Sequence, residues 1–245
     1  MNAFVAQARA ELLMTLRRGE SLLLAVIIPV FALVGFSSIH IVNTGPGKSI
    51  DFLTPGILAL AVMSTSMVSL SIATGFERYY GALKRLGSTP LGRPRLIAAK
   101  TAAILFVEII QGVILVAVGL LLGWHVHAGT NHLGIIAALG AWLLASIGFA
   151  GIGLFMAGRL SAFLILGLAN AFWFVMLLVS GMIAPLSTLP SWLASISKAL
   201  PSTALSQAFH SALGTQTSVS LHVWLVLAIW ALGSCTIAAM TFRWE

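Results

Sequence analysis

Long apolar stretches constrain this chain more than any other feature of its sequence. Of its 245 residues, 59% are hydrophobic and only 8% are charged, whereas soluble domains carry about 25% charged residues. A bilayer core about 30 Å thick requires roughly 20 apolar residues of helix, and lipid offers no partner for free backbone groups. The sequence therefore predicts an all-α membrane protein with a single transmembrane domain over residues 1–245.

Six stretches have the length and composition of transmembrane helices. They cover residues 21–42, 52–74, 101–124, 133–158, 160–184 and 221–242. The boundary between the fourth and fifth is the least defined, because only Arg159 and Ser161 interrupt the apolar run. Five or seven spans are the alternatives to six.

The positive charges predict the orientation, because loops on the cytoplasmic side are enriched in Lys and Arg. With the N-terminus inside, eleven of the 13 basic residues are cytoplasmic, and only Lys48 and Lys198 face outward. The reversed orientation would invert this ratio. We therefore expect a multi-pass protein of the plasma (cytoplasmic) membrane with both termini in the cytoplasm.

Three segments outside the spans are unusual. Residues 1–19 place apolar side chains at helical spacing, which is typical of a helix in the membrane interface. The polar segment 75–100 separates the second and third spans, and we expect a short amphipathic helix from Glu77 to Leu86, ended by Gly87 and Pro90. This segment is either a docking element for a cytoplasmic partner or a basic loop that only sets topology.

The third unusual segment, 185–220, follows the fifth span on the outer side. It contains Pro185, Pro190 and Pro201 together with apolar residues at helical spacing, including Trp192. It is half-apolar and too interrupted to cross the bilayer. We interpret it as two short helices that re-enter the outer leaflet, which is tolerated only where they are buried against protein.

These segments, in this order, resemble the permease subunits of type-2 ABC exporters, the family that includes daunorubicin-resistance permeases, polysaccharide exporters and ABCG transporters. The resemblance is to the daunorubicin-resistance-type and ABCG-like subunits, and it suggests an actinobacterial source. The residues that carry it are Glu77, Arg78, Gly81, Leu83, Leu86, Pro90, Lys100, Gly181, Pro185, Leu189, Pro190, Leu200, Pro201 and the ending Phe242-Arg243-Trp244-Glu245.

The resemblance implies an interfacial helix, six spans, a coupling helix in 75–100 and outer re-entrant helices between spans five and six. It also implies two nucleotide-binding subunits that bind ATP and Mg, a second permease that is identical or paralogous, and surrounding membrane lipids, with no cofactor on this chain. The substrate would be a hydrophobic or amphipathic drug, lipid or glycolipid, moved out of the cytoplasm or inner leaflet. The residues implied to contact the ATPase are Glu77, Arg78, Tyr79, Tyr80, Gly81, Leu83, Lys84, Arg85 and Leu86. The outer re-entrant or gate residues are Gly181, Pro185, Pro190, Trp192 and Pro201.

Polar and aromatic residues within the spans are candidates for the substrate cavity. Glu108 lies eight positions beyond Lys100, roughly 12 Å into the membrane at 1.5 Å per residue, where an ionisable group is costly and often functional. The alternative is a protonated glutamate that only packs against a neighbouring helix. For the small polar residues of spans two and five, close helix packing is the alternative to cavity lining. The candidates are Ser64, Thr65, Ser69, Glu108, Gln111, Asn170, Phe172 and Trp173.

Two further sequence patterns resemble binding sites. Gly47-Lys48-Ser49 looks like the end of a phosphate loop, but Val42 stands where that motif needs a glycine, so the ATPase is expected on a separate chain. His125, His127 and His132 could bind a metal ion, but no acid or cysteine lies near them, and we predict no metal site. A membrane-embedded, lipid-modifying enzyme or a metal- or cofactor-handling protein that uses the outer histidines is the alternative function.

Overall fold

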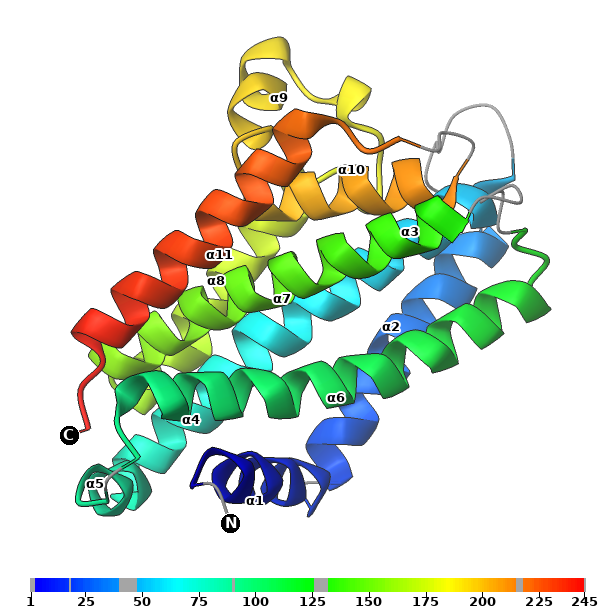
Figure 1. Ribbon diagram of the computed structural model, residues 1–245. Coiled ribbons are helices and arrows are strands. Elements are labelled where there is room, and N and C mark those ends of the chain that lie inside the picture. The colour runs from blue at the N-terminus through cyan, green and yellow to red at the C-terminus, as the bar shows by residue number, and fades with distance from the viewer. Residues whose placement is uncertain are drawn as a thin grey trace.

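The computed structural model describes residues 3–17, 19–39, 48–89, 91–125, 132–214 and 218–244, and within these ranges the regular structure is entirely helical. Figure 1 shows long helices that run between two ends of the bundle, with both chain termini at the same end. We call this the terminal end. The helices are α1 (Ala3–Arg17), α2 (Gly19–Ile39), α3 (Ser49–Met63), the π-helical η1 (Ser64–Ser69), α4 (Leu70–Tyr79), α5 (Ala82–Gly87), α6 (Arg93–Leu121), α7 (His132–Arg159), α8 (Ala162–Val179), the 3₁₀ turn η2 (Leu186–Thr188), α9 (Ser191–Ser197), α10 (Pro201–Leu213) and α11 (Leu221–Thr241).

Five helices in the described residues are long and apolar enough to cross a bilayer. They are Ser49–Tyr79, which joins α3, η1 and α4, and then Arg93–Leu121, His132–Arg159, Ala162–Val179 and Leu221–Thr241. The first predicted span, 21–42, falls on α2, whose apolar stretch Leu23–Ser38 is shorter, and residues 40–42 lie outside the described ranges. The prediction of a helical membrane protein is confirmed, while the count of six stays a prediction.

The helices on both sides of the predicted coupling segment are longer than hydropathy suggests. The second span helix extends to Tyr79 rather than 74, and the third begins at Arg93 rather than 101. Charged side chains are accommodated in these extensions because Glu77 and Lys100 pair with each other. Hydropathy alone treats each charge as unpaired and therefore ends the span too early.

The single short helix expected from Glu77 to Leu86 is wrong, because the chain breaks at Gly81. Gly81 has a φ of 74°, in the left-handed region that glycine adopts without strain. The chain therefore leaves α4 at Tyr79 and begins α5 at Ala82, and α5 ends at Gly87 as predicted.

Ser161 separates the fourth and fifth span helices, α7 and α8. Its side-chain oxygen accepts a hydrogen bond from the backbone N–H of Leu164 at 3.4 Å and caps α8. Helix α8 then ends at Val179, five residues before the predicted boundary, because the chain turns at Gly181, which has a φ of 73°. After this turn the backbone of Met182 packs on α3 so closely that a Cβ on Gly56 would lie 1.8 Å from the Met182 carbonyl oxygen.

The segment 185–220 forms η2, α9 and α10 at the end opposite the termini (Figure 1). Helix α10 packs against α7 and α3 and buries Leu205, Ala208 and Phe209. Helix α9 is more exposed, with Trp192 at 64% and Ile196 at 59% of their full exposure. Two helices are thus present where two were predicted, and their re-entry into the leaflet stays a prediction.

Candidate functional site

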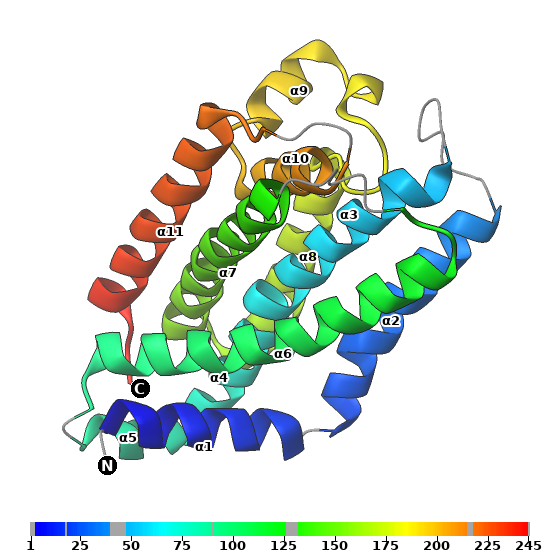
Figure 2. The same ribbon diagram turned by 45° about the vertical axis from the view of Figure 1, so that its right-hand side comes forward.

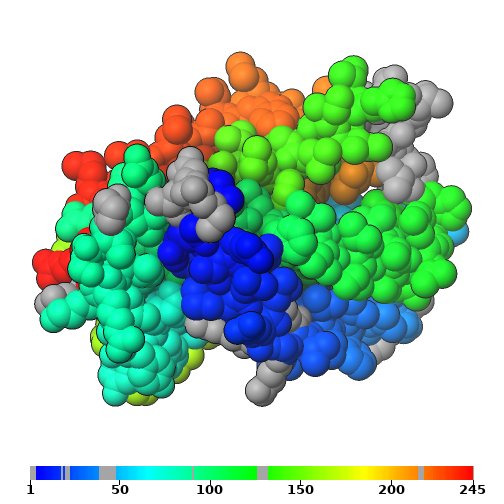
Figure 3. All heavy atoms as spheres, turned by 60° about the horizontal axis from the view of Figure 1, so that its bottom comes forward, coloured from blue at the N-terminus to red at the C-terminus, as the bar shows by residue number. Residues whose placement is uncertain are grey.

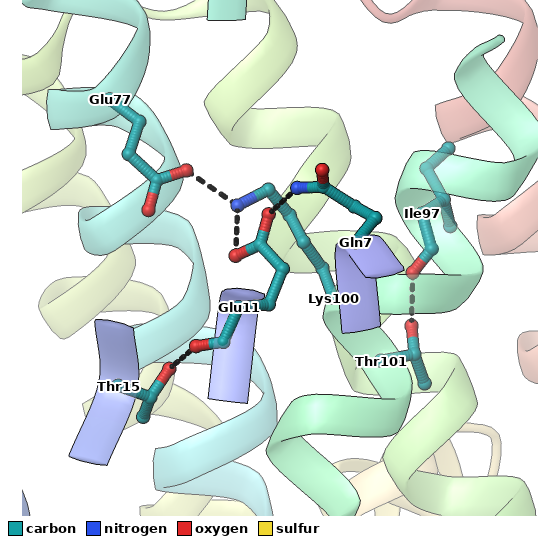
Figure 4. Close-up of polar contacts among 7 residues, drawn as sticks. All are labelled: Gln7, Glu11, Thr15, Glu77, Ile97, Lys100 and Thr101. Atoms are coloured by element: carbon teal, nitrogen blue, oxygen red, sulfur yellow. Dashed lines mark hydrogen bonds and ion pairs between the residues drawn. The ribbon is translucent and has the colours of Figure 1, made fainter. Parts of the chain in front are cut away.

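A buried ion cluster at the terminal end joins three helices. The Lys100 side chain, only 1% exposed, donates to Glu11 at 2.9 Å and to Glu77 at 2.5 Å. Gln7 Nε2 donates to the other oxygen of Glu11 at 2.8 Å. Figure 4 shows the lysine ammonium between the two carboxylates, which come from α1 and α4, while Lys100 belongs to α6.

This cluster fixes α1, which lies across the terminal end of the bundle (Figure 2). The Gln7 side chain adds a neutral donor to the charged groups of this cluster. Removal of one partner of such a buried pair costs about 3–5 kcal/mol, because a charge is then left uncompensated. The cluster therefore joins α1 to α4 and α6, the two helices that flank the predicted coupling helix α5.

The coupling segment rests on a small apolar cluster. Leu83 of α5 is fully buried against Leu91, Leu96 and Phe242, with Leu86 and Trp244 packed beside them. Helix α5 approaches the C-terminal residues so closely that a Cβ on Gly87 would lie 3.0 Å from the Trp244 ring. Leu83 and Leu86 are thus support residues beneath the segment.

Other predicted coupling residues face outward. Tyr79 and Tyr80 are 60% and 73% exposed, and Lys84 and Arg85 are also exposed. We call these four residues the exposed coupling face. The two tyrosine rings meet edge to face with centroids 5.2 Å apart, and Tyr79 also contacts Phe163 of α8.

Arg78, between these groups, donates to the backbone oxygen of Leu160. It therefore connects the end of α4 to the junction between α7 and α8. Figure 3 views the molecule toward the terminal end, where α1 in blue lies beside the blue-green segment that includes α5. The predicted coupling residues thus divide into an outward face and an inner set, Glu77, Arg78, Leu83 and Leu86, that holds this face in place.

A cavity of about 720 Å³ extends from this cluster into the bundle. Its lining includes Glu77, Tyr80 and Lys100 near the terminal end and Thr65 and Ser69 deeper in the second span helix. Thr65 and Ser69 are therefore the predicted cavity residues that line this space.

The π-helical turn η1 lies in the middle of the second span helix and directs its polar side chains in different directions. Ser64 accepts a hydrogen bond from the Trp173 indole at 2.8 Å, whereas Thr65 donates to Gln111 at 2.9 Å. Gln111 in turn donates to the backbone oxygen of Ala25 in α2. Such π-helical turns occur frequently at functional sites.

The remaining predicted cavity residues lie elsewhere. Asn170 and Phe172 are exposed on α8, and the Asn170 side chain donates to the backbone oxygen of Leu166. Glu108 is 4% exposed and accepts hydrogen bonds from Trp142 at 2.8 Å and Ser146 at 2.5 Å, both on α7. The eight candidates thus do not form one site.

The predicted gate residues occupy the turn after α8 and the helices that follow it. Gly181 and Pro201 are buried, Pro185 is half-buried, and Pro190 and Trp192 are exposed. Pro190 directly precedes α9, and Pro201 is the first residue of α10. The fixed φ of proline suits the start of a helix.

The outer histidines are largely separate from these contacts. His125, His132 and His222 are exposed, and His40 and His127 lie outside the described residues. His210 is buried, with Nε2 3.0 Å from the backbone oxygen of Phe52, and its burial lowers the pKa of the imidazole. Among the residues that the structure describes, no three His, Cys, Asp or Glu side chains lie together as metal ligands would.

The five long apolar helices in the described residues and the scarcity of charge in the sequence define a multi-pass helical membrane protein. The chain matches the family described as ABC-2 type transporter over residues 2–213, and it belongs to that family. It is therefore a permease subunit of an ABC transporter, whose partner is an ABC nucleotide-binding subunit. A search of curated proteins found no match. The match is to the broad family, so the daunorubicin-resistance type and the actinobacterial source stay predictions.

Sequence reasoning missed several residues of these networks. Glu11 is the one acid on the apolar-patterned α1, which was a usable signal for a buried partner. Trp142 and Ser146 stand four residues apart on α7 and therefore on one helix face, but nothing in the sequence directs that face toward Glu108. The π-helical turn has no reliable signature in the run Ser64-Thr65-Ser66.

Proposed function

We propose that this permease subunit exports a hydrophobic or amphipathic molecule, such as a drug, lipid or glycolipid, from the cytoplasm or the inner leaflet. Two copies of the nucleotide-binding subunit bind ATP and Mg²⁺ and drive the transport. A second permease, identical or paralogous, completes the transporter in the plasma membrane. The terminal end, with both termini, faces the cytoplasm.

The exposed coupling face carries this proposal. Tyr79, Tyr80, Lys84 and Arg85 present aromatic rings and positive charge to solvent at the end of a helix that continues into the membrane. Aromatic and Arg side chains are enriched at the energetic centres of protein interfaces. The face is attached to the second span helix itself, so a force on it acts directly on a helix that lines the 720 Å³ cavity.

The charges at the terminal end support the proposed orientation. Arg9, Arg17, Arg78, Lys84 and Arg85 all belong to α1 or to the segment near α5. Their concentration at one end favours a cytoplasmic location. Helix α2 runs from this end toward the opposite one (Figure 2). This supports α2 as a sixth membrane span, and an even number of spans places both termini on the same side of the membrane.

The cavity at the terminal end favours loading from the inner side. Its apolar walls, with Thr65, Ser69 and the ion cluster as polar groups, suit a molecule with an apolar body and a polar group. The cavity volume of about 720 Å³ lies within the 300–1,000 Å³ range that is typical of small-molecule sites.

The surface of α8 supports a second permease. In its most apolar window only 28% of the residues are buried, against 72% in the second span helix, and Asn170 is exposed on it. A polar side chain in a span usually faces protein or a water-filled cavity rather than lipid. We propose that α8 faces the second permease, with Phe172 and Asn170 toward the space between the two subunits.

The test compares substitutions on the exposed coupling face with a substitution at the opposite end of the permease. The permease and its nucleotide-binding subunit are purified together and reconstituted into liposomes. Arg85→Glu and Tyr80→Ala are expected to reduce the ATPase subunit that co-purifies, or its stimulation by the permease, by tenfold or more, because interface hot spots contribute about 2 kcal/mol or more. Lys198→Glu, an exposed charge reversal on the opposite end, is the matched control. Full coupling in Arg85→Glu and Tyr80→Ala would contradict the assignment of this face.

A further inference from the structure

Three arginines meet at the terminal end, where α4, α7 and the residues after α11 come together. Arg78, near the end of α4, donates to the backbone oxygen of Leu160, the residue that follows Arg159 at the end of α7. Figure 1 shows the C-terminal residues beside the ends of α7 and α8. Arg243 lies close enough to Arg78 for their charges to repel each other. We call Arg78, Arg159 and Arg243 the arginine cluster.

The backbone of Arg243 is held in position by its two neighbours. Phe242 is 1% exposed and belongs to the apolar cluster beneath α5, and Trp244 packs against Gly87. The Phe242 backbone passes α7 so closely that a Cβ on Gly158 would lie 3.0 Å from the Phe242 Cα. The Arg243 side chain is exposed between these two anchors. A guanidinium group on a fixed backbone loses less freedom when it binds a ligand.

The arginine cluster has no carboxylate partner in the part of the chain that the structure describes. Glu11 and Glu77 both pair with Lys100. The other two described acids lie elsewhere, because Glu108 is inside the membrane span of α6 and Asp51 is at the end opposite the termini (Figure 1). The cluster therefore concentrates positive charge that these four acids do not neutralise.

The donors of the cluster are accessible from outside the chain. Arg159 and Arg243 are exposed, and Arg78 is half-buried. A guanidinium group carries five N–H donors, and the hydrogen bond of Arg78 to Leu160 uses one of them. None of the other Arg78 nitrogens is a buried atom without a partner. Like charges that converge without a counter-charge repel each other, so an anion bound among them relieves this repulsion.

The position of the cluster indicates which anion it binds. Candidate spans end at Tyr79, Arg159 and Thr241, so the cluster lies at the level of the lipid headgroups. Exposed apolar side chains continue toward the bilayer core, with Phe155 one turn before Arg159 on the same face of α7 and Met240 near the end of α11, at 38% and 74% exposure. Guanidinium groups bind phosphate through paired hydrogen bonds, and basic pockets between span helices bind anionic headgroups. A carboxylate of a soluble partner would leave the apolar side chains unused.

We propose that the arginine cluster binds the phosphate of an anionic phospholipid from the leaflet at the terminal end. Arg78 and Arg243 donate to the phosphate oxygens, Arg159 adds the third positive charge, and the acyl chains lie along Phe155 and Met240. The bound lipid links the end of α4, which carries the exposed coupling face, to α7 and the C-terminal residues. This inference does not rest on export, because binding requires neither ATP nor the nucleotide-binding subunit.

The test measures lipid binding to the full chain in mild detergent by native mass spectrometry. Phosphatidylglycerol is compared with phosphatidylcholine, which has the same acyl chains and no net charge. A basic residue near an anionic surface contributes about 1 kcal/mol, or about a fivefold change in affinity, so phosphatidylglycerol should bind at least about fivefold more tightly. Inorganic phosphate at the same concentration should not displace phosphatidylglycerol, because it lacks the acyl chains. Displacement by inorganic phosphate would make free phosphate the ligand and overturn the proposal.

Two variants and one control locate the site. Arg159→Gln and Arg243→Gln, both at exposed positions, should each lower the affinity for phosphatidylglycerol about fivefold and leave that for phosphatidylcholine unchanged. Arg17→Gln removes an exposed charge from α1 at the same end and should bind both lipids like the unmodified chain. An equal loss in Arg17→Gln, or equal affinity of the unmodified chain for both lipids, overturns the proposal. Loss of the co-purifying nucleotide-binding subunit from Arg243→Gln, with unchanged affinity for phosphatidylglycerol, also overturns it and assigns the cluster to that subunit.

Discussion

Two buried sites that contain carboxyl groups share helix α6 and differ in whether charged or neutral groups pair with those carboxyl groups. Around Lys100 of α6, two carboxylates from α1 and α4 surround one ammonium group, so three helices are joined there. Around Glu108 the hydrogen-bonding groups are neutral, with Trp142 and Ser146 of α7 as donors to Oε2 and Ser66 of η1 beside the carboxyl group. The first site therefore joins three helices through ion pairs, whereas the second joins α6 to α7 through neutral hydrogen-bond donors.

The largest effect is expected from Lys100→Met. It leaves Glu11 and Glu77 buried without their cation, so we expect a loss of about 3–5 kcal/mol of stability, measured as a lower unfolding temperature in mild detergent. Lys198→Met, at an exposed lysine, is the control.

The triple change Glu11→Gln, Glu77→Gln and Lys100→Met separates charge from packing. Because no uncompensated charge is left, it should recover much of the lost stability. If Lys100→Met is as stable as Lys198→Met, the cluster is not a brace and the comparison fails.

A smaller effect is expected at the second site from Trp142→Phe. It removes one of the two donors to Glu108 and leaves the ring packing nearly intact, so the expected cost is about 1–3 kcal/mol. Trp224→Phe, at a half-buried tryptophan on α11, serves as the control for the ring change. A loss as large as that of Lys100→Met would mean that neutral donors hold Glu108 as strongly as the ion pairs hold Lys100, and the contrast between the two sites would fail.

These two sites also show how far sequence reasoning reaches. The spans, the α5 stop at Gly87, the α9 and α10 pair and the burial of Glu108 all follow from local rules about hydropathy, glycine, proline and the cost of charge in lipid. The partners of the charges do not follow, because Glu11 and Lys100 are 89 positions apart in the sequence. Hydropathy also places the adjoining ends of the second and third spans too far from α5, because it does not register that Glu77 of α4 and Lys100 of α6 form an ion pair.

The predicted coupling residues show the same limit of sequence reasoning for individual side chains. The resemblance assigns nine residues to contact with the ATPase, but it does not distinguish inward from outward side chains. The left-handed Gly81 rotates α5 relative to α4, so that Leu83 points into the protein while Tyr80 remains exposed. That rotation depends on backbone geometry and on the C-terminal residues beneath α5, which no local pattern predicts.

The smallest effect is expected from the protonation of His210, a buried histidine at the end of the bundle opposite the termini. Burial lowers the pKa of His210 below its ordinary value of 6.5. Stability is therefore complete above about pH 6.5 and decreases as the pH falls below it, because the unfolded chain takes up a proton that the folded chain excludes.

The measurement is the unfolding temperature of the unmodified chain and of His210→Gln at pH 8 and at about pH 5.5. Between pH 8 and about pH 5.5, the unfolding temperature of the unmodified chain should fall by up to a few degrees more than that of the variant. The comparison with the variant separates the effect of His210 from that of the other titrating groups. An identical pH response in both chains would show that His210 does not contribute.

Coupling of the permease to ATP hydrolysis requires that the nucleotide-binding subunit docks on the exposed coupling face. The most direct measurement places a photoreactive phenylalanine analogue at Tyr80, on that face, or at Trp192, on α9 at the opposite end, in cells that contain the complete transporter. Both positions are well exposed, at 73% and 64%. We predict an adduct with a nucleotide-binding subunit from position 80 alone. An adduct from position 192 alone, or from neither position while the complex still co-purifies, would contradict the account.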